Sequence, residues 1–154
     1  MIRLATERDK AAINELRRQV NDLHVQGRPD IFKPGFGPEI RDHVDMYLRQ
    51  ENGYAAVAEI GGRVAGMVMV DYIDRPEGPY SLARHFVHIA EICVHASFRR
   101  QGVGRALMDF VKSDARHKGY PRIELDVWAF NDALAFYESE GFTTYRRYLE
   151  MDVP

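Results

Sequence analysis

The chain has 154 residues, of which 45% are hydrophobic and 29% charged, and its formal net charge is −2 at pH 7. These values are typical of a globular protein and provide no bulk attraction to nucleic acid or to anionic membranes. The single cysteine, Cys93, excludes an internal disulfide framework and a cysteine-based metal cluster. The length favours one domain over residues 1–154. No apolar run matches a membrane span or a signal peptide, so we expect a cytoplasmic protein with no membrane partner.

The first third of the chain predicts one short strand and two helices. Ile2–Leu4 can form the strand, and Thr6 with Asp9 resembles a capping box at the start of a helix. Apolar residues recur at helical spacing over residues 7–23 and again over residues 40–49. Between these helices, the glycines and prolines of residues 24–38 predict a long loop with aromatic anchors.

The middle of the chain predicts three neighbouring strands. Residues 54–60 and 63–73 are strand-like, and the Gly61-Gly62 pair between them is a hairpin signal. Residues 86–95 form a third apolar run. A helix is expected over residues 102–118, with Gly119 as its C-terminal cap.

The last third predicts a strand over residues 123–127, a helix over residues 132–140 and a final strand over residues 142–151. The complete order is therefore β-α-α-β-β-β-α-β-α-β. Hairpins combined with crossover helices indicate an α/β (α+β) fold with a central mixed sheet flanked by helices.

The sequence RRQGVGR at residues 99–105 lies where a strand becomes a helix. The first N–H groups of a helix lack intrahelical partners and lie at the positive end of its dipole, so they form an anion site that suits phosphate. Gly102 and Gly104 would let the backbone approach the ligand, and Arg99, Arg100 and Arg105 would add positive charge. The stretch predicts a pyrophosphate site, and a solvated turn is the alternative.

Two familiar phosphate motifs fit this stretch poorly. A nucleoside-triphosphate P-loop needs a lysine and a hydroxyl residue after the second glycine, but Arg105 and Ala106 follow Gly104. A dinucleotide fingerprint needs a third glycine near position 107, where the chain has Leu107.

The chain resembles the GNAT superfamily of N-acetyltransferases in two motifs. The family signature R/Q-x-x-G-x-G/A, which follows its fourth strand, matches residues 99–104. An asparagine, an amphipathic helix and Tyr-x-x-x-Gly-Phe match from Asn131 through Tyr137 to Phe142. Asn131 and Tyr137 are six positions apart, whereas the family commonly has seven, so capping of the helix is an alternative role for Asn131. The order of elements agrees from Ile2 to Met151.

The resemblance implies transfer of an acetyl group from acetyl-CoA, as co-substrate, to a primary amine. The pyrophosphate of acetyl-CoA would lie on the amides of residues 101–104, and its pantetheine arm would pair with a strand backbone where the fourth and fifth strands splay apart. The residues expected to bind acetyl-CoA are Ile92, Cys93, Val94, Arg99, Arg100, Gln101, Gly102, Val103, Gly104, Arg105, Asn131 and Tyr137.

Direct transfer requires a base for the amine, a donor to the developing oxyanion and an acid for the leaving thiolate. The resemblance assigns the acid to Tyr137 and the oxyanion donor to the amide of Val94. It offers Glu91 as the base, and His88 competes because its imidazole is suited to pH 7. Because side chains alternate between the two faces of a strand, Glu91 and His88 should point to opposite faces unless a bulge lies between them. Each of these three side chains also has a purely structural alternative, in packing or in a salt bridge.

In the family, the first long loop borders the acceptor pocket. Its candidate acceptor-binding residues here are His24, Arg28, Asp30, Phe32 and Phe36. The histidines show no HxH or HExxH spacing, so we expect no metal. A catalytically silent acyl-CoA-binding sensor or regulatory module, or a transferase of another acyl group, is the alternative function, and the resemblance makes a homodimer plausible.

Overall fold

The computed structural model describes residues 1–154, which form five strands and five helices with two short 3-10 turns. In chain order these are β1 (Ile2–Leu4), a turn at Glu7–Asp9, α1 (Lys10–Gly27), α2 (Pro38–Asp42), α3 (Asp45–Leu48), β2 (Gly53–Ile60), β3 (Arg63–Arg75), β4 (Arg84–Val94), a turn at Ala96–Phe98, α4 (Val103–His117), β5 (Ile123–Glu124) and α5 (Leu134–Ser139).

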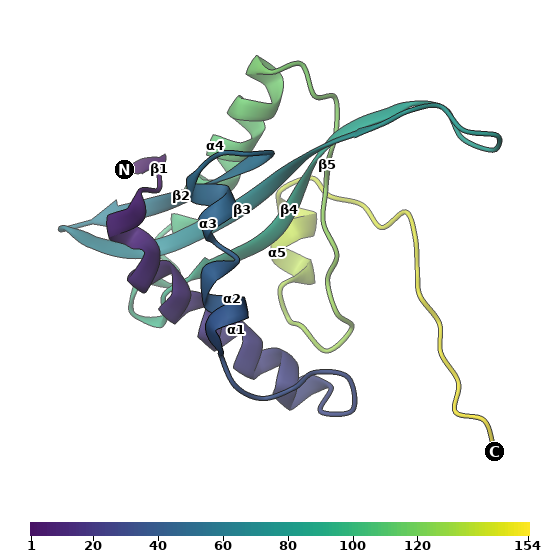
Figure 1. Ribbon diagram of the computed structural model, residues 1–154, viewed down its shortest axis with the longest axis horizontal. Helices are drawn as coiled ribbons and strands as arrows, with labels where there is room; N and C mark the ends of the chain where they lie inside the picture. Colours follow the sequence, from purple (N-terminus) through teal and green to yellow (C-terminus); the bar gives the residue numbers. More distant parts are fainter.

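The strands form one mixed sheet in the order β1-β2-β3-β4-β5 (Figure 1). The first four strands pair antiparallel, and β5 pairs parallel to β4 through Val87 with Ile123 and His88 with Glu124. The β2–β3 hairpin turns at Gly61 and Gly62, whose φ angles of 56° and 75° suit glycine. This architecture confirms the predicted α/β fold with a mixed sheet.

Both faces of the central strands are buried, which explains their nearly continuous apolar sequences. On one face, Val57, Met67 and Met69 pack with Ile13 and Leu16 of α1. On the opposite face, Val68 and Val70 belong to a second apolar cluster that includes Leu107, Met108 and Val111 of α4. Figure 1 shows α1 and α4 on opposite sides of the sheet. No helix is both long and apolar enough to cross a membrane.

A bulge in β4 changes which side chains share a face. Met69 lies opposite Glu91 and Val70 lies opposite Ile89, which leaves Ala90 as an extra residue in β4. His88 lies opposite Asp71, two positions along β3 from Met69. Residues two apart on a strand point to the same face, so Glu91 and His88 both lie on the α1 face. The bulge therefore breaks the simple alternation of side chains along β4 and places Glu91 and His88 on the same face.

Several predicted boundaries are wrong. Helix α1 extends to Gly27, so His24 lies in its last turn and not in the loop, and the helix expected over residues 40–49 is two short helices. Only Ile123–Glu124 of the strand expected over residues 123–127 is paired. No strand forms over residues 142–151, because a strand needs a partner and the segment from Thr143 onward makes no backbone hydrogen bond.

Candidate active site

The turn before α4 presents a run of unpaired N–H groups. None of the backbone N–H groups of residues 100–105 donates a hydrogen bond within the chain. Arg100 and Gly102 have positive φ angles of 62° and 79°, which curl the backbone before the helix begins at Val103. For Arg100, which carries a Cβ, this conformation is uncommon. The turn therefore offers the N–H groups and helix dipole of an anion site.

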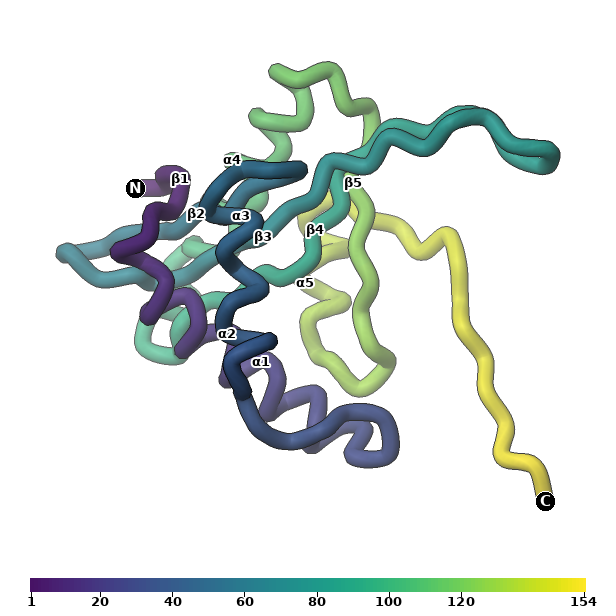
Figure 2. The backbone as a smooth tube through the Cα atoms, in the orientation of Figure 1, coloured from purple at the N-terminus to yellow at the C-terminus, as the bar shows by residue number.

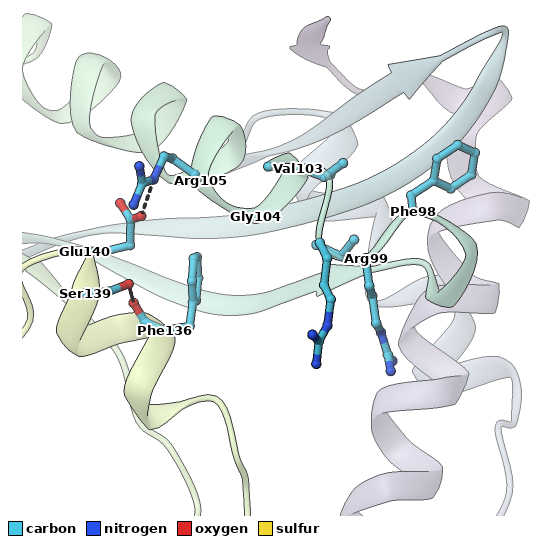
Figure 3. A pocket seen from close by; sticks show the side chains of 11 residues that line it. Phe98, Arg99, Val103, Gly104, Arg105, Phe136, Ser139 and Glu140 are labelled. Carbon is cyan, nitrogen blue, oxygen red and sulfur yellow. Dashed lines mark hydrogen bonds and ion pairs between the residues drawn. The ribbon is translucent and has the colours of Figure 1, made fainter.

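A groove of about 330 Å³ lies over this turn (Figure 3). Phe136 and Ser139 of α5 form the opposite wall, and the lining residues are Val94, Phe98, Arg99, Arg100, Gly102, Val103, Gly104, Arg105, Phe136, Ser139 and Glu140. Arg105 is ion-paired with Glu140 at 3.1 Å. In Figure 3 the side chain of Arg99 points away from this pair. A larger hollow of about 600 Å³ borders only Arg3, Thr6, Glu7 and Arg8 and is unrelated to the turn.

Strand β4 has free backbone groups beside this groove. Its pairing with β5 ends at His88, so residues 89–94 have no neighbouring strand on that side. The N–H of His95 donates to the carbonyl of Ala65 on the β3 side. Because alternate residues of an antiparallel strand face the same neighbour, the N–H and C=O groups of Val94 and Ile92 face the open side. The backbone of Cys93 faces β3, so the structure does not support its expected backbone contact with the pantetheine arm.

Tyr137 packs into the α4-side core from α5, with 9% of its surface exposed. Its hydroxyl makes no hydrogen bond to another residue, whereas the hydroxyls of Tyr72, Tyr120 and Tyr145 all do. Burial, together with the nearby Cys93, raises the pKa of Tyr137. Burial raises the pKa of the Cys93 thiol to about 11. Near neutral pH, both groups are therefore protonated.

Glu91 forms an ion pair with an arginine that sequence analysis missed. Arg17 of α1 donates from Nε to Oε2 of Glu91 at 2.9 Å, and its guanidinium also donates to Asn14 and to the carbonyl of Ile40. The Arg17 side chain is 4% exposed, whereas that of Glu91 is 28% exposed. Glu91 is thus held in place by a buried cation but remains accessible.

His88 lies between two carboxylates. Its Nδ1 is 3.5 Å from Asp71 and its Nε2 is 4.0 Å from Asp126. The hydrogen bond to Asp71 raises the pKa of His88, with a smaller opposing effect of burial. The imidazole therefore carries a proton to higher pH than an ordinary histidine would.

The residues proposed for acceptor binding do not form a single cluster. His24 stacks on Phe32 with ring centroids 4.9 Å apart. Two aromatic rings that follow β5 complete the cluster, since His24 contacts Phe130 and Phe32 contacts Trp128. Phe36 lies apart from this cluster, with the guanidinium groups of Arg17 and Arg18 each 5.5 Å from its ring centroid.

Arg28 and Asp30 pair with each other at 2.7 Å, at the edge of the first loop. Asn131 accepts a hydrogen bond from the N–H of Ala133 at 2.9 Å, immediately before α5. Because Ala133 is the residue at the N-cap of α5, this contact closes a turn ahead of the helix, and the expected cofactor contact of Asn131 stays a prediction. No group of three or more metal-ligating side chains is present.

The family model described as "Acetyltransferase (GNAT) family" matches residues 17–142. The chain belongs to this family. It is 31% identical to human N-acetyltransferase 8 over 105 residues, which span 68% of this chain and 44% of the human protein. A crystal structure of a single-site mutant of the BH1408 protein from Bacillus halodurans matches with a TM-score of 0.95 and 28% identity, over 100% of this chain and 99% of that one.

More distant solved structures share the GNAT fold. AAC(6')-Iy in complex with a bisubstrate analogue, CoA-S-monomethyl-acetylneamine, matches with a TM-score of 0.76 and 18% identity over 100% of this chain and 97% of that chain. A predicted acetyltransferase from Clostridium acetobutylicum with acetyl-CoA matches with a TM-score of 0.74 and 17% identity over 99% and 95% of the two chains.

In this GNAT chain, sequence reasoning missed residues whose importance depends on packing. Arg17 belongs to an otherwise ordinary amphipathic helix, and nothing in its spacing indicates burial beside β4. Asp71 lies opposite His88 only because of the strand register. Trp128 is the only tryptophan in the chain and lies three residues before Asn131, which is the one signal that could have drawn attention to the β5–α5 loop.

Proposed function

We propose that this chain transfers an acetyl group from acetyl-CoA to a primary amine by direct attack, and that residues 1–154 form one acetyltransferase domain. The proposal rests on the run of free N–H groups at residues 100–105, which opens into a groove beside an unpaired strand edge. Family membership supports this assignment. A pyrophosphate suits the turn because it is a compact anion that can accept several N–H bonds at once.

The free backbone edge of β4 and the turn before α4 would bind different parts of acetyl-CoA. Ile92, through its N–H and C=O, and Val94, through its C=O, can pair with the amides of the pantetheine arm as a neighbouring strand would. Arg99 and Arg100, which border the groove, can contact the phosphates. These contacts would direct the thioester toward the open side of β4, near Tyr137.

Two groups of this chain can assist the transfer from that position. The free N–H of Val94 can donate to the thioester carbonyl oxygen as negative charge develops there. The protonated hydroxyl of Tyr137 has no hydrogen-bonding partner within the chain and can donate its proton to the departing sulfur. When bound, acetyl-CoA supplies the activated acetyl group, and no protein nucleophile is needed.

Glu91 is the favoured base because of its position on β4. It lies three residues before Val94, or about 10 Å along an extended strand, whereas His88 lies about 20 Å away. The amine must approach within a few ångströms of the thioester carbon, so a proton passing to Glu91 needs fewer intervening waters than one passing to His88. Arg17 and the bulge aim Glu91 toward the α1 face.

Acetyl-CoA should raise the thermal stability of the protein. At 100 times its dissociation constant, it should add about 2.7 kcal/mol to the free energy of unfolding, whereas adenosine alone should add much less. Scanning calorimetry or dye-monitored unfolding measures the shift. If neither acetyl-CoA nor CoA shifts the unfolding temperature, the proposed function is wrong.

Gly104→Val should weaken binding of acetyl-CoA by about tenfold or more, which corresponds to about 1.4 kcal/mol. A Cβ at position 104 would lie 3.2 Å from Cζ of Phe136, so the larger side chain and the ring would compete for space in the groove. The change in folding stability should be smaller, because this ring can move. Calorimetric titration measures the affinity. Gly37→Val is the matched control, since a Cβ there meets nothing within 4 Å. Wild-type affinity in folded Gly104→Val would refute this site.

Asp71→Asn distinguishes the two candidate bases. Asp71 raises the pKa of His88, so its removal should lower that pKa. If His88 were the base, the rise of activity with pH would shift to lower pH, because a base must be deprotonated to act. We expect no such shift, because Glu91 fills this role. Asp74→Asn, which removes the partner of His85 at 2.8 Å, is the control. A shift confined to Asp71→Asn in the pH profile of kcat/KM would reassign the base to His88.

The acceptor class follows from the surroundings of Glu91. Carboxylates of Glu91, Asp71 and Asp126 lie on one face of the sheet, and the ring of His24, in the last turn of α1, stacks on that of Phe32 in the first loop. Acidic and aromatic groups together suit a cationic amine on a small molecule. A related fold, from an aminoglycoside acetyltransferase of an uncultured soil metagenomic sample, was crystallised with sisomicin. An amine panel read by thiol release would identify the acceptor; release of no thiol with any amine would favour the silent acyl-CoA-binding module.

A further inference from the structure

Glu140, at the end of α5, is a buried carboxylate that the proposed reaction does not use. Its side chain is 4% exposed and forms an ion pair with Nζ of Lys112 at 2.8 Å. A second ion pair joins it to Nε of Arg105 at 3.1 Å (Figure 3). Arg105 and Lys112 are seven positions apart, or about two turns of helix, so both lie on the same face of α4. One carboxylate therefore connects the two helices that border the groove, as the backbone trace in Figure 2 shows for α4 and α5.

Two of these charges are placed unfavourably with respect to their own helices. Arg105 lies in the first turn of α4, at the positive end of the helix dipole, and Glu140 follows the last residue of α5, at a negative end. Their ion pair offsets both unfavourable interactions. A phosphate on the turn would offset the charge of Arg105 as well. Residues that break a local rule in this way are typical of functional sites, and helix stability does not explain them.

Helix α5 depends on Glu140 because the helix is short. Its six residues, Leu134–Ser139, are too few for a stable isolated helix, and its backbone hydrogen bonds reach no other helix or strand. Side chains must therefore hold it against the body of the molecule. Phe136 and Tyr137 pack into the α4-side core, and Glu140 makes the only ion pairs of residues 131–142. Since Glu140 is three positions after Tyr137, its contacts also fix the phenol hydroxyl.

Arg105 can leave Glu140 more easily than Lys112 can. The Arg105 side chain is 68% exposed and that of Lys112 is 35% exposed, and Arg105 makes the longer of the two contacts. Exposed ion pairs are weak, so this guanidinium can turn toward another anion. Arg105 lines the groove, and its planar donors suit a phosphate. If Arg105 turned to a phosphate there, Lys112 would still neutralise Glu140, and no charge would be left unpaired.

We propose that Glu140 is a positioning residue for the transfer, which fixes α5 through Lys112 and releases Arg105 to a phosphate of acetyl-CoA. This inference rests on the proposed function, because it requires acetyl-CoA in the groove. Before binding, the carboxylate holds Arg105 at the groove wall. After binding, Arg105 contacts the phosphate, and Lys112 alone pairs with Glu140. The carboxylate therefore competes weakly with acetyl-CoA and keeps Tyr137 beside the departing sulfur.

Glu140→Gln should tighten the binding of acetyl-CoA by about two- to fivefold, because Arg105 then leaves no carboxylate when it turns to the phosphate. Arg105→Gln should weaken binding by a similar factor, and in that background Glu140→Gln should have no further effect. Calorimetric titration measures Kd, and circular dichroism establishes folding. Glu138→Gln, which removes the same charge from an exposed position of α5, is the control and should keep wild-type affinity.

Three results of these titrations would overturn the proposal. The first is unchanged or weaker binding in folded Glu140→Gln, and the second is a tightening that persists when Arg105 is absent. The third is unchanged affinity in Arg105→Gln, a change at an exposed position that does not threaten folding.

Lys112→Met should lower kcat by about 10- to 100-fold, because a small displacement of the acid from the sulfur slows proton transfer. Lys112→Arg keeps the cation and should restore most of the activity. In a Tyr137→Phe background, Lys112→Met should cause no further loss, because the hydroxyl that it helps to place is absent. Thiol release measures kcat. Full activity in Lys112→Met, or an equal additional loss in the Tyr137→Phe background, contradicts the positioning role.

Binding by the wild-type chain separates this inference from the proposed function. If the wild type binds neither acetyl-CoA nor CoA in the titration, the proposed function is wrong and this inference falls with it. If the wild type binds and the variants of Glu140 and Arg105 do not change the affinity as expected, only this inference is wrong.

Discussion

Tyr137→Phe is expected to lower kcat by about 10²–10⁴-fold, the usual contribution of general acid catalysis, with little change in affinity for acetyl-CoA. The substitution deletes one hydroxyl and keeps the ring that packs between α5 and the sheet. Because this hydroxyl makes no hydrogen bond within the chain, its loss leaves no protein group unpaired, and folding stability should be nearly unchanged. Thiol release with the identified amine acceptor measures kcat, and calorimetric titration measures affinity.

Tyr120→Phe is the matched control for this experiment. It also removes a phenol hydroxyl, but one that donates to Asp74 at 3.0 Å, away from the groove. Its kcat should equal that of the wild type. Full activity in Tyr137→Phe would show that Tyr137 contributes only packing. The thiolate would then leave unaided or be protonated by water.

Arg17→Leu should lower the free energy of unfolding by about 1–3 kcal/mol, the usual cost of leaving a buried polar group without its hydrogen-bonding partner. The substitution leaves Glu91 without its cation and the carbonyl of Ile40 without its donor. Activity should fall as well, since Arg17 positions the proposed base. Chemical denaturation measures the stability, and kcat/KM at a temperature where the variant is folded measures the effect on activity.

Arg18→Leu provides a neighbouring comparison on the same helix. The Arg18 side chain is 55% exposed and its ion pair with Glu15 is 3.8 Å long, so this change should alter stability by no more than about 0.5 kcal/mol. Both arginines contact the ring of Phe36, so that contact is lost equally in each variant. Equal stability losses in the two variants would show that the pair with Glu91 is not the source of the effect.

The conformation of the turn at residues 99–104 could be predicted from the sequence because it depends on local interactions. The unpaired N–H groups at the start of α4 and the positive φ of Gly102 depend on a few consecutive residues. The motif at residues 99–104 contains those residues, so it predicts both features. The Gly61-Gly62 hairpin and the end of α5 before Gly141 follow from the same local rules. The order of hairpins and crossover helices also predicted the mixed sheet that the structure has.

Contacts between distant segments could not be predicted in this way. Glu91 and Arg17 are 74 positions apart, and their pairing requires the register of β4, the bulge at Ala90 and the placement of α1 over the sheet. The aromatic cluster around Phe32 and Trp128 likewise joins two loops that meet only after folding.

Residues 143–154, which form no helix or strand, show the limit of what the sequence by itself determined. The sequence predicted a strand over residues 142–151, just as the glycines of residues 99–105 predicted an anion site. Only the tertiary structure decided that its own sheet leaves it unpaired, because strand formation requires hydrogen bonds to a neighbour whose position no local pattern specifies. Local sequence determines which conformation a segment can adopt, and the assembled fold determines whether a partner is present to stabilise it.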